Sequence, residues 1–118
     1  MLTKFEKVTT RDALEDGKAL VVRFGREEIC LVRWDGKFFA FANNCPHMDS
    51  PMQWGYIEQG FIECPWHGFR YDLGTGARLR IPGADRLDLY PVRIVDDDVY
   101  VGPRPPSTDP PRGTPYYG

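Results

Sequence analysis

Residues 45–47 read Cys45-Pro46-His47, and residues 64–67 read Cys64-Pro65-Trp66-His67. These two stretches contain both histidines of the chain and two of its three cysteines. Thiolate and imidazole side chains together bind zinc, copper or iron–sulfur centres, and ligand type alone does not separate the three. The sequence therefore predicts a metal centre to which each stretch supplies one cysteine and one histidine.

The order of the ligands narrows the choice of metal. Zinc fingers usually present a cysteine pair and then a histidine pair, whereas each stretch here contains one residue of each kind. This alternation suits a two-iron cluster in which two thiolates hold one iron and two imidazoles hold the other. Because neutral imidazoles replace charged thiolates, an added electron is less repelled, and the reduction potential rises into a window of roughly −150 to +300 mV. A structural zinc site remains the alternative.

The rest of the chain, up to residue 102, is typical of short strands separated by turns. Asp35-Gly36 is a strong two-residue hairpin signal between apolar runs, and the polar segment 11–17 predicts one helical turn that ends at Gly17. The predicted strands cover residues 2–8, 19–24, 29–34, 37–42, 56–58, 61–64, 69–72, 77–80, 87–95 and 99–101, with a turn at 96–98. This pattern predicts an all-β fold, an antiparallel sandwich or barrel, in which a metal would clamp two loops together at one end.

Composition limits the classes of function. The chain has 118 residues and a net charge of −2, so we expect one domain and find no electrostatic support for nucleic-acid binding. No apolar run reaches membrane-spanning length, and the first residues lack the pattern of a secretion signal, which favours a cytoplasmic location. Six of the eleven prolines follow residue 102. We therefore expect a domain over residues 1–102 and an extended or mobile proline-rich tail over 103–118.

Other residues near these stretches have simpler interpretations. Cys30 lies in the apolar run 29–32, which predicts a buried free thiol that packs as a small hydrophobic side chain. Arg70, Arg78 and Arg80 follow the second stretch, and we interpret them as an ordinary solvated face.

The two metal-binding stretches resemble the ligand loops of Rieske proteins, and the resemblance extends over about residues 2–102. The further matching positions are Asn44, Pro51, Gly68, Phe69-Arg70-Tyr71-Asp72, Gly74-Thr75-Gly76, Ile81-Pro82-Gly83, Leu89-Tyr90-Pro91-Val92 and Val99-Tyr100-Val101. The resemblance implies a Rieske-type antiparallel β-sandwich with a smaller cluster-binding subdomain formed by two loops. It also implies one [2Fe–2S] cluster per chain.

The same resemblance assigns roles to the ligands. It implies that Cys45 and Cys64 bind the inner iron, and that His47 and His67 bind the outer iron through Nδ1. The His47/His67 edge at the tip of the protein would then be the electron port, where partners dock. Four further residues would surround the cluster, with the last in a covering loop: Trp66, Gly68, Tyr71 and Pro82.

Departures from the respiratory Rieske proteins favour the ferredoxin type. Those proteins carry an extra cysteine in each loop, joined as a disulfide, whereas here no cysteine closely follows His47, and Trp66 stands in the second loop. Phe69 occupies the position of a serine that donates to the cluster in those proteins, while Tyr71 keeps the phenol that can donate to a cysteine sulfur. With fewer donors the reduced cluster is stabilised less, so we expect a potential toward the low end of the range.

The resemblance implies an electron-transfer component, not an enzyme. A catalytic oxygenase subunit needs a mononuclear iron, commonly held by two histidines and a carboxylate, and both histidines here are already used. The chain would accept electrons from a flavin-dependent NAD(P)H reductase and pass them to the terminal oxygenase of an aromatic-hydrocarbon dioxygenase system. We expect no nucleic-acid, membrane or small-molecule substrate partner. The alternatives are a Rieske small subunit of a larger oxidoreductase, such as assimilatory nitrite reductase, and a zinc-clamped binding module.

Overall fold

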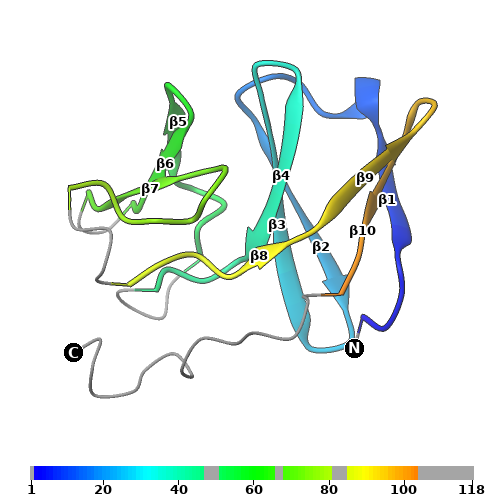
Figure 1. Cartoon of the computed structure of the whole chain (residues 1–118), viewed down its shortest axis with the longest axis horizontal. Helices are drawn as coiled ribbons and strands as arrows, with labels where there is room; N and C mark the ends of the chain where they lie inside the picture. The colour runs from blue at the N-terminus through cyan, green and yellow to red at the C-terminus, as the bar shows by residue number, and fades with distance from the viewer. Residues whose placement is uncertain (1, 47–50, 66–67, 81–84, 104–118) are drawn as a thin grey trace.

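The computed structural model describes residues 2–46, 51–65, 68–80 and 85–103. Within these ranges the chain forms three antiparallel sheets, with strand orders β1-β10-β9, β2-β3-β4-β8 and β5-β6-β7 (Figure 1). The elements are β1 (Glu6–Thr10), η1 (Arg11–Ala13), β2 (Ala19–Phe24), β3 (Glu27–Trp34), β4 (Lys37–Ala42), β5 (Tyr56–Glu58), β6 (Phe61–Glu63), β7 (Arg70–Asp72), β8 (Leu89–Tyr90), β9 (Val92–Val95) and β10 (Asp98–Val101). The predicted all-β fold is confirmed.

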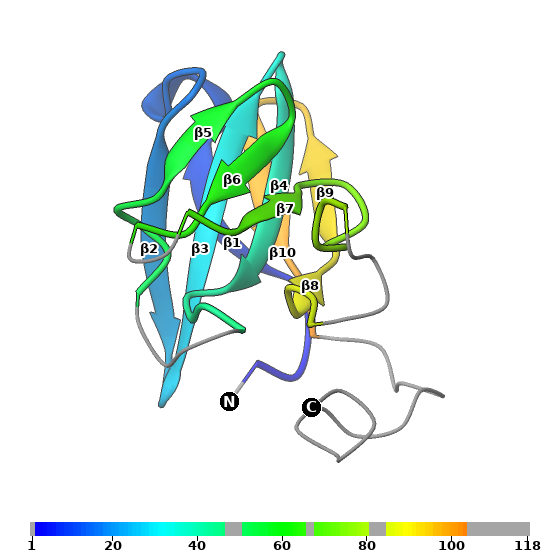
Figure 2. The same ribbon diagram turned by 90° about the vertical axis from the view of Figure 1, so that its left-hand side faces the viewer.

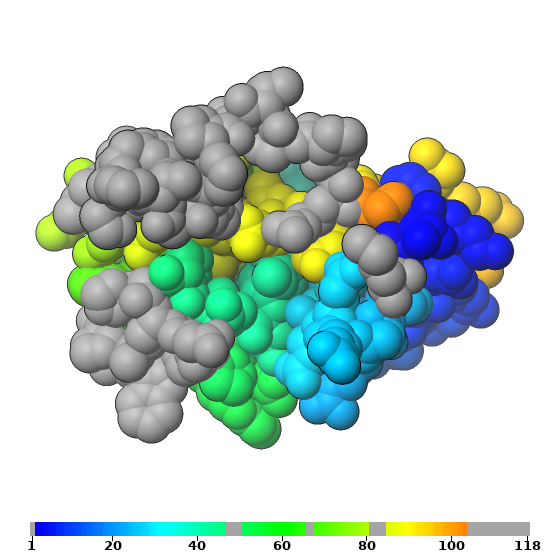
Figure 3. Space-filling view, turned by 90° about the horizontal axis from the view of Figure 1, so that it is seen from below, coloured from blue at the N-terminus to red at the C-terminus, as the bar shows by residue number. Residues whose placement is uncertain are grey.

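The sheet that contains β3 lies between the other two. Figure 1 shows the β1-β10-β9 sheet on its right and the β5-β6-β7 sheet on its left, and Figure 2 looks onto the latter, in front of β3 and β4. Seen from below, the same order runs from the blue and orange strands, past the cyan β2–β3 turn, to green and yellow residues (Figure 3). The cluster-binding subdomain therefore has a small sheet of its own besides the two predicted loops.

Strand β3 has a hydrophobic core on each of its faces. Successive side chains of a strand point to opposite sides, so Ile29 and Leu31 pack toward β1-β10-β9, in a core with Val99 and Val101. Cys30 and Val32 pack into the other core. All four consecutive residues from 29 to 32 are fully buried, which explains the uninterrupted apolar run in the sequence.

The Asp35-Gly36 hairpin forms as predicted. Trp34 pairs with Lys37 across the turn, and Asp35 and Gly36 have φ of 53° and 75°. A type I′ turn requires positive φ at both central residues, which is the reason this dipeptide is favoured there. Asp16 supports the turn, because its carboxylate accepts the backbone N–H groups of Asp35 (3.1 Å) and Gly36 (2.9 Å).

The predicted strand 87–95 is wrong as a single element. Proline has no N–H to donate to a sheet, and at Pro91 the segment divides into β8, which pairs with β4, and β9, which pairs with β10. The chain thus passes from one sheet to the next at this residue. The turn that follows is also shorter than predicted, because Asp98 already pairs with Val95 in β10.

Other boundaries also differ from the prediction, by one or two residues in β3, β6 and β7 and by more in three further segments. The first strand begins at Glu6 and ends at Thr10, and it lies at the edge of its sheet. The helical turn is a 3₁₀ turn that ends at Ala13 and not at Gly17. Segment 77–80 makes two isolated bridges in place of a strand, Tyr71↔Arg78 and Ala77↔Arg86, because each of its two bridging residues pairs with a different segment.

Two further sequence predictions concern the proline-rich tail and membrane-spanning segments. The predicted tail lies, from residue 104 on, outside the described residues, so the division at residue 102 stays a prediction. Among the described residues no helix has the length and apolar character needed to cross a bilayer.

Candidate metal centre

The second cysteine lies at the closed end of a hairpin. Cys64 directly follows β6, its N–H donates to the carbonyl of Phe69 (2.7 Å), and its own carbonyl accepts the N–H of Gly68 (3.0 Å). Gly68 has a φ of 71°, a conformation that glycine adopts without the steric cost of a Cβ. The backbone of residues 64–69 is therefore pinned at both ends, and Gly68 contributes through its conformation. Trp66 and His67 lie outside the described residues.

The first cysteine is fixed by its neighbour Asn43. β4 ends at Ala42, and the buried side chain of Asn43 forms four hydrogen bonds to flanking segments. Its Oδ1 accepts the backbone N–H groups of Met52 (2.9 Å) and Gln53 (3.0 Å). Its amide nitrogen donates to the side chains of Gln53 (2.7 Å) and Glu28 (3.1 Å). Asn43 thus joins both ends of the segment that contains Cys45 to strand β3, a role that the sequence analysis missed.

Gly55 allows this segment to pack closely on β6. A Cβ at Gly55 would lie 2.6 Å from the carbonyl oxygen of Glu63 and 2.9 Å from that of Met52. Its lack of a side chain brings the end of the first loop against the residue that precedes Cys64. The end of the first predicted ligand loop therefore lies next to the start of the second.

The cysteine half of the predicted site is buried in one core. Cys45 and Cys64 are each 1% exposed, neither forms a disulfide, and both belong to the buried cluster that includes Met52 and Tyr71. Two cysteines in one core that form no disulfide are the donor set that the inner iron of a histidine- and cysteine-bound [2Fe–2S] cluster requires. The residues described fit that group. His47 lies outside the described residues, as do His67 and the covering residue Pro82.

Cys30 lies in the same core but differs in kind. It is in the middle of β3, fully buried, and burial raises the pKa of its thiol to about 12. Thiolates are the form that binds metals, so a thiol that stays protonated at neutral pH is a packing residue. The predicted role of Cys30 is confirmed.

Tyr71 has a different hydrogen-bond partner from the one predicted. Its side chain is fully buried, and its hydroxyl donates to Oδ2 of Asp85 at 3.1 Å. Burial, together with the charge of Asp85, raises the pKa of the phenol above its usual range, so the hydroxyl remains a donor. Because a phenol carries one proton, the expected donation to a cysteine sulfur competes with this bond to Asp85.

Arg78 completes this polar group and is not the solvated residue that the sequence suggested. Its Nη1 lies 3.5 Å from Oδ1 of Asp85, the two side chains are 17% and 20% exposed, and its guanidinium stacks 3.7 Å above the ring of Phe69. Arg70, by contrast, is half exposed and pairs with Glu63 at 2.9 Å. Asp85 and Arg78 carried no signal in the sequence, since neither lies in a ligand motif.

The fold and the paired cysteines define an iron–sulfur protein, and comparison with known families identifies which kind. The family model of the Rieske [2Fe-2S] domain matches residues 4–91, and the chain belongs to this family. Its cofactor is accordingly a Rieske-type [2Fe–2S] cluster.

Two curated relatives show the contexts in which such a domain occurs. The chain is 37% identical over 95 residues to the 3-phenylpropionate/cinnamic acid dioxygenase ferredoxin subunit of Photorhabdus laumondii, a match that covers 80% of this chain and 90% of that protein. It is 36% identical over 88 residues to human apoptosis-inducing factor 3, covering 75% of this chain. It spans only 14% of the length of that human relative.

Solved structures share the fold along most of their length. The ferredoxin of carbazole 1,9a-dioxygenase from Nocardioides aromaticivorans superposes with a TM-score of 0.77 at 27% identity, covering 86% of this chain and 99% of that one. The ferredoxin in a complex of the carbazole 1,9a-dioxygenase oxygenase with its ferredoxin superposes with a TM-score of 0.76 at 26% identity, covering 82% of this chain and 100% of that one. A protein described as a nitrite reductase small subunit from Mycobacterium tuberculosis superposes with a TM-score of 0.74 at 21% identity, covering 86% of this chain and 96% of that one. At that identity the likeness concerns the fold alone.

Proposed function

We propose that the chain is a one-electron carrier whose cluster is bound by Cys45 and Cys64 at one iron and by His47 and His67 at the other. The observation that carries this proposal is the pair of buried cysteines in one core, neither in a disulfide and each at the start of a segment that continues to a histidine. When bound, a Rieske cluster supplies a reversible one-electron couple. The protein's own contribution is to bury the cysteine side and to hold the two loops together.

The proposed partners are a flavin-dependent NAD(P)H reductase, which donates the electron, and a terminal oxygenase, which accepts it. Relatives that match along most of their length are named as ferredoxin subunits of dioxygenase systems, and one similar structure contains an oxygenase with its ferredoxin. Neither histidine is left for a mononuclear iron, so the chain acts as a component and not as the catalyst. A cytoplasmic location is part of this proposal.

Docking through the His47/His67 tip is part of this proposal, and two exposed aromatic side chains between the two cysteines in the sequence suit it. Trp54 is 74% exposed and Tyr56 is 59% exposed. Tyr56 pairs with Glu63 in the β5–β6 hairpin, next to Cys64. Aromatic residues are enriched in the cores of protein interfaces, so this surface, Trp54 and Tyr56, suits a protein partner near the electron port. The expected consequence of Trp54→Ala is slower electron delivery to an oxygenase with an unchanged reduction potential.

The ligand assignment is tested by three matched alanine variants. Cys45→Ala and Cys64→Ala each remove a proposed ligand, while Cys30→Ala removes a thiol from the same core that the proposal leaves unligated. We expect the first two to lose the visible absorption and the electron paramagnetic resonance signal of the reduced Rieske cluster, and Cys30→Ala to retain iron and sulfide at parent stoichiometry. A parent protein without inorganic sulfide, or a Cys30→Ala variant that alone loses the cluster, contradicts the proposal.

The carrier role is tested by stopped-flow reduction of the loaded protein with an NADH-dependent flavin reductase, followed by mixing with a dioxygenase terminal component. We expect single-electron reduction and reoxidation by the oxygenase. A loaded protein that co-purifies in fixed stoichiometry with a nitrite reductase, and exchanges electrons only within that complex, would favour the small-subunit alternative.

A further inference from the structure

A carboxylate, a phenol and a guanidinium form one hydrogen-bonded chain beside the cysteine core. Asp85 accepts the hydroxyl of Tyr71 at 3.1 Å and pairs with Arg78 at 3.5 Å. Arg78 in turn lies 3.7 Å above the ring of Phe69, the residue whose carbonyl closes the Cys64 hairpin. Both charged side chains are about four-fifths buried. This Tyr71–Asp85–Arg78 group is therefore fixed by packing as well as by charge.

The group lies against the proposed ligands. Tyr71 is fully buried in the same core as Cys45 and Cys64, and Cys45 is one of the groups that act electrostatically on its phenol. Asp85 is one hydrogen bond further away. A unit charge on Asp85 therefore lies within the range at which partly buried charges interact strongly, because solvent screens them little there.

Two effects of Asp85 act in the same direction. Hydrogen bonds to cluster sulfurs stabilise the reduced, more negative cluster and raise its potential. A hydroxyl has one proton to give, and a carboxylate is the stronger acceptor because the bond is charge-assisted. The carboxylate also repels an added electron, and Arg78 offsets that repulsion only in part, since it pairs with Oδ1 of Asp85 whereas Oδ2 faces the Tyr71 phenol.

We propose that Asp85 is a positioning residue that lowers the reduction potential, by holding the phenol proton of Tyr71 on its own carboxylate and by placing a negative charge beside the cysteine side of the site. This inference rests on the ligand set given under Proposed function. No bond is made or broken, and the only exchange is one electron between the cluster and an electrode.

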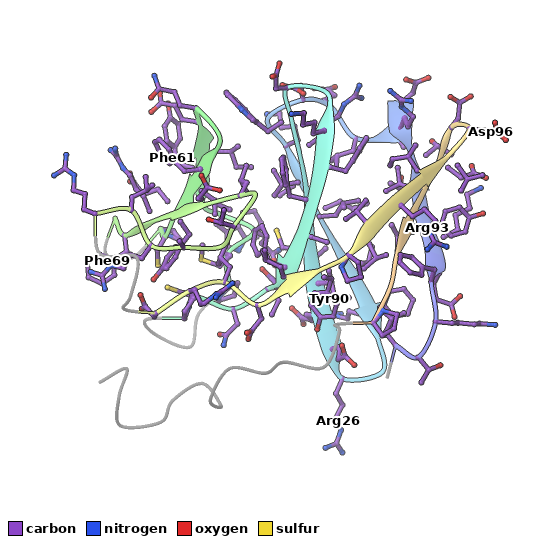
Figure 4. All side chains as sticks on the ribbon, in the orientation of Figure 1. Arg26, Phe61, Phe69, Tyr90, Arg93 and Asp96 are labelled. Atoms are coloured by element: carbon purple, nitrogen blue, oxygen red, sulfur yellow. The ribbon has the colours of Figure 1, made fainter. Side chains whose placement is uncertain are left out.

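The test measures the potential of the loaded full-length protein by protein-film voltammetry. Asp85→Asn keeps the shape of the side chain and removes the charge. We expect it to favour reduction about tenfold, which for a one-electron couple is ~59 mV upward. Asp98→Asn is the matched control: Asp98 also pairs with a cation, Lys7 at 3.2 Å, but it begins β10 beside Asp96, at the end of the molecule opposite Phe69 (Figure 4). We expect no upward shift there.

Tyr71→Phe separates the proton from the charge. Because the Tyr71 phenol donates to Asp85, we expect Tyr71→Phe to change the reduction equilibrium less than about threefold in the parent. We expect it to lower that equilibrium clearly in the Asp85→Ala background, where position 85 has no acceptor left and the phenol is released toward sulfur. Asp85→Glu, which keeps the charge, should stay closer to the parent than Asp85→Asn does.

The outcomes distinguish this inference from the proposed function. An Asp85→Asn potential no higher than that of Asp98→Asn overturns the role of Asp85. A tenfold or greater fall of the reduction equilibrium in the single variant Tyr71→Phe also overturns this role, since the phenol would then already donate to the cluster. This second test can be made even if Asp85→Asn does not bind the cluster. A parent protein without the Rieske spectrum instead refutes the ligand assignment.

Discussion

Replacing Asn43 with alanine removes the side chain that ties the first ligand loop to β3. Its Oδ1 is the acceptor for the backbone N–H of Met52, which is fully buried, and for that of Gln53, which is partly buried. A buried donor without a partner costs about 1–3 kcal/mol, and a partly hydrated one about 0.5–1.5 kcal/mol. The sum is about 3 kcal/mol, a large share of the roughly 5–15 kcal/mol that stabilises a typical domain. The hydrogen bond to half-buried Glu28 adds to this loss.

Calorimetry of the loaded protein at pH 7 measures the effect as a shift of the unfolding midpoint. A loss of about 3 kcal/mol corresponds to a decrease of about 10–20 °C in a domain of this size. Asn44→Ala is the control, because the neighbouring Asn44 is exposed and surface substitutions usually change stability by less than about 0.5 kcal/mol. If Asn43→Ala melts within a few degrees of Asn44→Ala, the loop is not held by this side chain, and the account of how Cys45 is positioned is wrong.

Three further predictions concern single residues. Gly55→Ala should lose about 1–3 kcal/mol by overpacking against Glu63, measured as a lower melting temperature. Gly74→Ala should lose less, because its new carbon meets only side-chain atoms, of Asp72 at 3.3 Å and of Phe39 at 4.0 Å. Equal losses refute the close-approach argument. Cys30 should resist iodoacetamide at pH 8 in the folded protein, because its pKa of about 12 leaves almost no thiolate, and mass spectrometry showing labelling as fast as in urea contradicts this. The backbone N–H of Gly36, then that of Asp35, lowers the pKa of Asp16. The parent should therefore be more stable than Asp16→Asn by a difference that is fully present above about pH 4 and decreases as the pH falls further. A difference in melting temperature that stays constant down to pH 3 would exclude this role of Asp16.

Local chemistry made much of the fold predictable. The predicted ranges 19–24, 37–42 and 56–58 agree with β2, β4 and β5 residue for residue, because each is a compact apolar or aromatic run bounded by turn residues. The Asp35-Gly36 turn was equally plain, since few dipeptides adopt positive φ twice. These features depend on neighbours in sequence alone.

The same local reasoning could not predict which strands pair with each other. The apolar content of residues 87–95 is continuous, and nothing local states that β8 pairs with β4 while β9 pairs with β10. Pro91 carried the one available signal, since it lacks the N–H that a continuous strand would donate. Segment 77–80 was misread for a related reason: its residues suit a strand, but only single bridges are available to them.

The candidate site was also predicted only in part. The ligands were predicted because four rare residue types recur in a fixed order, whereas the residues that hold the cysteine side in place were not. Asp85 reaches Tyr71 across 14 positions, and Asn43 reaches Glu28 across 15. Asp and Asn are ordinary loop residues, so their burial becomes visible only when the sheets are assembled.

The position of the cysteines in the core changes what the ligand loops must provide. The sequence analysis expected a metal to clamp the two ligand loops together. In the structure, Cys45 and Cys64 are as buried as Met52 and Ile62, and their loops are joined to β3 by Asn43 and to β6 through Gly55. Because packed side chains in a core have little freedom to move, the geometry of the sulfur ligands is set by the same contacts that stabilise the fold. A polar group such as Tyr71–Asp85–Arg78, built into that core, therefore acts on the cysteine ligands at a fixed distance, and a change of one charge there should alter the potential without altering the fold.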